Sequence, residues 1–137
     1  KNISQEFIKI IKSFIIAEDF DAPDINVLNL WINWYKKDQM AIPHCHNTHL
    51  SLVFFVDVEK TNTSFLINKE YKHCFLIKKG DSKTFNNKIV DVKVKDGTCL
   101  MFDGGLYHST TPNLTDHKRI TLAVNFEVAY PKKKGEY

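Results

Sequence analysis

The sequence has little of what would mark a secreted, membrane-spanning or nucleic-acid-binding protein. Its three cysteines, Cys45, Cys74 and Cys99, are odd in number and lack CxxC spacing, which argues against a disulfide framework or a zinc ribbon. No apolar run approaches the roughly 18 to 20 residues that a membrane span needs. The net charge is only +3, and the excess lies largely in residues 131–134. We therefore expect reduced thiols in an intracellular, cytoplasmic protein with no membrane partner, and nucleic acid is not a favoured partner.

Extremes of composition are also missing. Hydrophobic residues make up 43% of the chain and charged residues 26%, so neither a disordered nor a fibrous protein is indicated. A chain of 137 residues is long enough for one ordinary hydrophobic core and short for two. We predict a single domain over residues 1–137.

The hydrophobic pattern predicts one helix followed by strands. Over residues 4–16 the apolar positions repeat near every 3.6 residues, with Ser4 as the N-cap, which predicts an amphipathic helix. From residue 27 the period changes to two, and strands are predicted at 27–35, 50–59, 64–67, 71–77, 89–94, 98–102 and 119–128. Many short strands without intervening helices indicate an antiparallel sandwich, barrel or jelly roll over residues 27–128. The helix should pack outside one sheet, and residues 129–137 form a basic tail.

The segment "PHCHNTHL" places three histidines within six residues, just before an apolar strand. In an extended chain the side chains of His44 and His46 point the same way, and that of Cys45 points to the other face. Two imidazoles can then converge on one ion, and His108, which follows the bend Gly104-Gly105, is the candidate for a third ligand. The alternative is that these histidines are structural or solvated. His49 falls on the opposite face, and His73 and His117 are expected to be structural.

A second pattern begins the last predicted strand. Arg119, Thr121, Ala123 and Asn125 share one face of it by the period of two, and the other face is apolar. An arginine and a threonine two residues apart, beside a metal, form a receptor for a carboxylate. The pattern therefore favours a site for an organic acid.

The stretches "WINWYKKDQMAIPHCHNTHLSLVFFVDV" and "VKDGTCLMFDGGLYHSTTPNLTDHKRITLAVNF" resemble the iron(II)- and 2-oxoglutarate-dependent oxygenases, over roughly residues 27–128. The resemblance is to a small branch with an HxH…H metal motif, and it implies a mainly β, double-stranded β-helix (cupin-like) fold. It implies iron ligands at His44, His46 and His108, and 2-oxoglutarate held by Arg119 and Thr121. Asn33, Tyr35 and Asn125 are further candidates for contacts with this cosubstrate.

The same resemblance implies a hydroxylase that uses Fe(II), O2 and 2-oxoglutarate, with ascorbate as a candidate stimulant. His46 stands where most of the superfamily has an acidic residue, which softens the metal preference of the site. Two alternatives stay open: a metal-binding cupin, and a degenerate oxygenase that serves as a binding domain without turnover. Arg119 and Thr121 favour the oxygenase over the cupin. The substrate, whether small molecule, peptide or protein, cannot be read from the sequence, and exposed edge strands leave a homodimer open.

Overall fold

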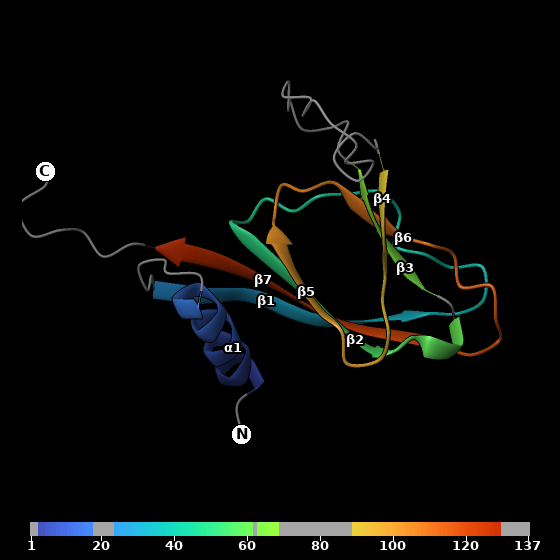
Figure 1. The fold of residues 1–137 in the computed structure, drawn as a ribbon, viewed down its shortest axis with the longest axis horizontal. Helices are drawn as coiled ribbons and strands as arrows, with labels where there is room; N and C mark the ends of the chain where they lie inside the picture. Colours follow the sequence, from blue (N-terminus) through green and yellow to red (C-terminus); the bar gives the residue numbers. More distant parts are fainter. Residues whose placement is uncertain (1–2, 18–23, 62, 69–88, 130–137) are drawn as a thin grey trace, which may run out of the picture.

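The computed structural model consists of two antiparallel sheets and one helix (Figure 1). It describes residues 3–17, 24–61, 63–68 and 89–129. The larger sheet has the strand order β1-β7-β2-β5, and the smaller sheet has the order β4-β3-β6. Their bounds are β1 Asp24–Tyr35, β2 Leu50–Asp57, β3 Ser64–Asn68, β4 Ile89–Lys93, β5 Cys99–Asp103, β6 His108–Thr110 and β7 Arg119–Ala129. A short 3-10 helix, Glu59–Thr61, connects β2 to β3.

Helix α1, Ile3–Ala17, packs on the outer face of the larger sheet, as the sequence predicted (Figure 1). Phe7 and Ile11 lie one turn apart and are both buried, because an apolar stripe at this spacing faces one side of a helix. They belong to a core cluster with Ile25, Leu52, Leu122, Val124 and Phe126 from β1, β2 and β7. No helix in the described part of the chain is long and apolar enough to cross a membrane.

A second core fills the space between the two sheets. Strand β2 contributes to both cores, because successive side chains point to opposite faces: Leu52 joins the helix side, whereas Phe55 joins Val58 and Phe65 between the sheets. Two facing antiparallel sheets with this alternation form the predicted mainly β, cupin-like jelly roll.

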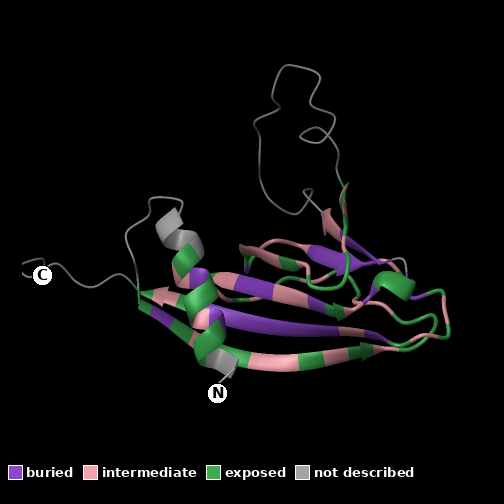
Figure 2. Cartoon of the chain, turned by 60° about the horizontal axis from the view of Figure 1, so that its bottom comes forward, coloured by how far each residue is buried: buried purple, intermediate pink, exposed green. Residues whose placement is uncertain are grey.

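Strand β7 is buried over most of its length, with seven of its eleven residues buried (Figure 2). It lies between β1 and β2, and its register places Arg119 opposite Tyr35, Thr121 opposite Asn33, and Asn125 opposite Ser51. Polar residues that were predicted from separate parts of the sequence therefore become neighbours on one face of the larger sheet.

The structure differs from the predicted strands in several places. Strand β2 ends at Asp57, two residues before the predicted end, and Glu59 begins the 3-10 helix. Strand β1 begins at Asp24, three residues before the predicted start, and its Ile25 is buried against the helix. Strand β6 was not predicted, because three residues are too short to show an alternating pattern. The predicted strand at 71–77 lies outside the described residues, as do Cys74 and His73.

Candidate active site

Backbone hydrogen bonds hold the HxH segment against the strand that carries the third histidine. The amide of His44 donates to the carbonyl of His108 at 3.0 Å, and the amide of His108 donates back to His44 at 2.8 Å. The amide of His46 donates to the carbonyl of Gly104 at 2.7 Å. The main chain thus holds the backbones of His44 and His108 side by side and that of His46 against the bend at Gly104.

Gly104 permits this close approach. A Cβ atom at this position would overlap the carbonyl oxygen and the hydroxyl of Thr48, whereas one at Gly105 would meet only the Asp103 carboxylate, at 3.1 Å. A glycine is therefore required at the first residue of the predicted bend, because two backbone segments pass close to each other there.

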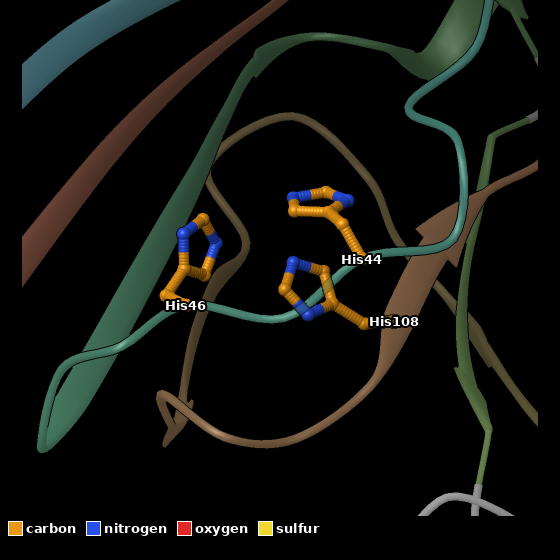
Figure 3. A group of neighbouring side chains, drawn as sticks. All are labelled: His44, His46 and His108. Atoms are coloured by element: carbon orange, nitrogen blue, oxygen red, sulfur yellow. The ribbon is translucent and has the colours of Figure 1, made fainter.

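The rings of His44, His46 and His108 turn toward one another (Figure 3). One ligand nitrogen from each lies within 4.8 Å of the other two. The ring centroids are 5.0 Å apart for His44 and His46, 4.4 Å for His44 and His108, and 5.2 Å for His46 and His108. The structure therefore brings together the three residues that the sequence predicted as metal ligands.

Hydrogen bonds to backbone carbonyls set the tautomers of two of these rings. Nδ1 of His44 lies 2.6 Å from the carbonyl oxygen of Ile42, and Nδ1 of His108 lies 2.8 Å from that of Leu106. A carbonyl oxygen only accepts, so Nδ1 carries the hydrogen in both rings. In the neutral ring the lone pair is then on Nε2, which is the arrangement of a metal-binding histidine.

Burial favours the neutral form of His108 and His46. His108 is 3% exposed, between the rings of Phe65 and Phe102. This burial lowers the pKa of His108 to about 4, although the hydrogen bond to the Leu106 carbonyl opposes the shift. Burial, and then the nearby His44, also lowers the pKa of His46. A neutral imidazole is the form that binds a metal ion.

The guanidinium of Arg119 is fully buried and has no acidic partner among the described residues. It stacks over the ring of Tyr35 at 4.5 Å, and burial lowers its pKa while Tyr35 raises it. Its Nη atoms donate to the carbonyls of Thr111 at 2.7 Å and Gln39 at 3.3 Å, and to the hydroxyls of Thr110 at 3.1 Å and Thr63 at 3.3 Å. Its Nε is buried and has no hydrogen-bond partner in the part of the chain that the structure describes.

A cavity of about 70 Å³ lies beside the three histidines. Thr121, Asn33 and Tyr35, all predicted site residues, line it, and Asn33 donates to the Thr121 hydroxyl at 3.3 Å. Arg119 does not line the cavity itself but contacts Tyr35 and Thr110, which do. Asn125 lies outside the cavity lining, next to His46.

Several site residues were not predicted from the sequence. Trp31 lines the cavity, packs against His46 with centroids 5.9 Å apart, and donates from its indole to Asn33 at 3.1 Å. The sequence did carry a signal for Trp31. It lies two residues before Asn33 and four before Tyr35, so its side chain points to the same face of β1. The acceptors around Arg119 come from loops and short strands, where the sequence carries no readable pattern.

The remaining described histidines lie outside the cluster. His49 is exposed and accepts a hydrogen bond from the amide of Val128 at 3.0 Å. Nε2 of His117 lies 2.8 Å from the carboxylate of Asp57. Both interactions are structural, joining segments that are distant in sequence.

The antiparallel jelly roll with three converging histidines is the architecture of a non-heme metal enzyme or of a cupin-like metal-binding protein. Residues 29–125 match the family model described as "Putative 2OG-Fe(II) oxygenase". The chain belongs to this family of 2-oxoglutarate- and iron(II)-dependent oxygenases. No curated protein matches the chain in sequence.

Several solved structures share the fold. An oxidoreductase of the 2OG-Fe(II) oxygenase family from Burkholderia pseudomallei is 12% identical, with a TM-score of 0.65 over 85% of this chain and 51% of that one. SnoN, a non-heme alpha-ketoglutarate-dependent epimerase of nogalamycin biosynthesis, is 15% identical (TM-score 0.63; 98% and 61%). HygX from Streptomyces hygroscopicus with iron bound is 15% identical (TM-score 0.63; 93% and 68%). The chain thus spans about half to two thirds of the length of these proteins.

Proposed function

We propose that this protein is an oxygenase that binds Fe(II) through His44, His46 and His108 and holds 2-oxoglutarate against Arg119 and Thr121. The observation that carries the proposal is the convergence of three imidazoles within 4.8 Å beside a cavity backed by a buried arginine. Family membership supports the same cosubstrate and metal. Fe(II) and 2-oxoglutarate, with O2, supply the oxidation, for which hydroxylation is the expected outcome.

The donor set fits a metal ion. Three imidazoles converge, each able to offer one ring nitrogen to an ion, and an ion held by these three ligands would have further positions for the cosubstrate and O2. The rings of Phe65 and Phe102 against His108 exclude water from that ligand. The role of these protein groups is to hold the ion in place within a dry cavity.

The environment of Arg119 fits a carboxylate. A buried cation is costly without an anionic partner, and the described residues supply none to Arg119 and leave its Nε donor unused. Two of its four hydrogen bonds are long, at 3.3 Å, and are therefore weak. An incoming carboxylate would replace these two more easily than the two shorter ones. The Thr121 hydroxyl, on the same face of β7 and in the cavity wall, supplies a further donor.

The primary substrate would approach through a wider hollow. A space of about 510 Å³ adjoins His46 and is lined by polar side chains, among them Thr48, His49 and Glu127. This size is in the range of pockets that take a small molecule or a peptide side chain. We propose this hollow as the substrate entrance.

Succinate release tests the proposal. Purified protein supplied with ferrous iron, 2-oxoglutarate and ascorbate in air should form succinate, and the variant His108→Ala should form none. Cys45→Ser is the matched control, because this thiol lies between two proposed ligands yet is exposed, so its loss should not change turnover. A folded, metal-loaded protein that released no succinate would contradict catalysis.

That outcome would favour the second candidate function, a binding domain that keeps the pocket without turnover. The all-histidine ligand set favours this candidate, since an oxygenase usually has one acidic ligand. Binding of 2-oxoglutarate to the nickel-loaded protein, without succinate formation in the iron-loaded protein, would distinguish it from an active enzyme.

A further inference from the structure

A buried amide lies directly behind His46. The side chain of Asn125 is 5% exposed, and Nδ2 lies 3.4 Å from Nδ1 of His46. On its other side, Oδ1 accepts a hydrogen bond of 2.8 Å from the hydroxyl of Ser51, which is 2% exposed. The two residues are directly opposite each other in the pairing of β2 with β7.

This orientation of the amide conflicts with metal binding. An amide nitrogen only donates, so it would require the lone pair of His46 on Nδ1. The hydrogen of the neutral ring would then lie on Nε2, the nitrogen that faces His44 and His108 (Figure 3). In His44 and His108, by contrast, Nδ1 carries the hydrogen and Nε2 is left with the lone pair.

Rotating the amide by half a turn removes the conflict. Oδ1 then accepts from Nδ1–H of His46, and Nδ2 donates to the hydroxyl of Ser51. A hydroxyl both donates and accepts, so Ser51 satisfies either orientation. When it accepts from Asn125, its own hydrogen can be donated to the Thr48 hydroxyl, 3.4 Å away.

We propose that Asn125 is a positioning residue that places His46 in its metal-binding tautomer, with Ser51 as the switchable partner. The inference rests on the proposed metal role of the three histidines. It gives Asn125 a different role from the predicted contact with 2-oxoglutarate. Histidine ligands of metals commonly donate their second N–H to such a partner, whose loss weakens metal binding about 10- to 100-fold.

Two variants at one position test the proposal. Anaerobic titration of the metal-free protein with Ni(II) should show Asn125→Leu weakened about 10- to 100-fold, because Nδ1–H of His46 loses its acceptor. Asn125→Asp should bind at least as tightly as the wild type, because a carboxylate only accepts. Asn26→Leu, at an exposed asparagine of β1 that pairs with Glu127 and not with Asn125, is the control for the same exchange and should bind like the wild type.

NMR of the wild-type protein gives a second test, which does not depend on whether a variant folds. In the zinc-loaded protein, Nδ1 of His46 should carry a hydrogen and Nε2 should be metal-bound. An unprotonated Nδ1 would overturn the proposal, as would Asn125→Leu and Asn125→Asp binding Ni(II) equally well or equally poorly. If the wild type binds no metal at all, the proposed function fails first and the positioning role with it.

Discussion

At the scale of single residues, His108 owes its properties to the two aromatic rings around it. Phe65 stacks on it with an interplanar angle of 23°, and Phe102 meets it edge-on at 61°. These contacts remove water from the imidazole, which is why its pKa falls to about 4. The residue is therefore neutral over the whole physiological range.

We expect the metal-free protein to lose stability as the pH falls from about 6.5 to about 4. In this window the unfolded chain protonates His108 and the folded chain does not, so the unfolded state binds more protons. The free energy of unfolding should fall by up to about 1.4 kcal/mol per pH unit from this residue, with no such effect above pH 6.5. Urea denaturation in the presence of a chelator measures it, and His108→Gln should show a smaller slope. Equal slopes would contradict the assignment.

Thr121→Val should weaken 2-oxoglutarate binding while leaving metal affinity unchanged. The exchange keeps the shape of the side chain and removes one hydroxyl from the cavity wall. One such hydrogen bond contributes about 0.5 to 1.5 kcal/mol, or roughly a 2- to 10-fold change in Kd. Calorimetric titration of nickel-loaded protein gives this Kd, and the Ni(II) affinity of the same variant is the control. An unchanged Kd would exclude Thr121 as a contact.

The sequence could predict which side chains lie together where the alternation of side chains along an extended segment decides it. His44 and His46 share a side in any extended segment, and Thr121 and Ala123 share a face of any regular strand. The immediate surroundings could not be predicted in this way. The acceptors of Arg119 come from Gln39, Thr63 and Thr111, whose proximity depends on tertiary packing of distant segments.

At the scale of elements, the bend between β5 and β6 controls the geometry of the cluster. The carbonyl of Gly104 accepts a hydrogen bond from the amide of His46, and the amide of Gly104 donates one to the carbonyl of His49 at 3.1 Å. The bend therefore holds the chain at the second histidine of the HxH segment and again three residues further on.

Gly104→Ala should lower both stability and metal affinity. The added methyl group would overlap Thr48, and such overpacking costs about 1 to 3 kcal/mol. Displacing the bend also moves His46, so Ni(II) binding should weaken. Gly105→Ala is the neighbouring control, expected within about 0.5 kcal/mol of the wild type by urea denaturation. Similar losses in both variants would show that the contact with Thr48 is unimportant.

Elements were predictable where their periods were long and unbroken. Strand β7 keeps a period of two over eleven residues, and α1 shows an apolar stripe over four turns. Strand β6 has only three residues, all buried, so it shows no alternation. Its identity comes from pairing with β3 and with His44, which are long-range contacts.

At the scale of the whole molecule, both sheets and the segments between them contribute to the site. The cavity is lined from β1, β2 and β7 of the larger sheet and from β3 and β6 of the smaller one. A ligand that bridges these walls should therefore stabilise the fold as a unit. That residues 1–137 form one domain stays a prediction.

Thermal unfolding should report this linkage. N-oxalylglycine, an analogue of 2-oxoglutarate, should raise Tm only in the presence of Ni(II), and at about 100 times its Kd it should add about 2.7 kcal/mol. His108→Gln is the control and should respond to neither addition. Stabilisation of the wild type by the analogue without metal would contradict a joint site.

The paired backbone hydrogen bonds between His44 and His108 have one more consequence. The backbone amide of each residue donates a hydrogen bond to the carbonyl of the other. Neither amide can therefore exchange its hydrogen with solvent unless the two segments separate. An ion bound by both side chains would hold the same two segments together. Deuterium uptake at these two amides thus reports opening of the centre itself, whatever substrate the protein proves to act on.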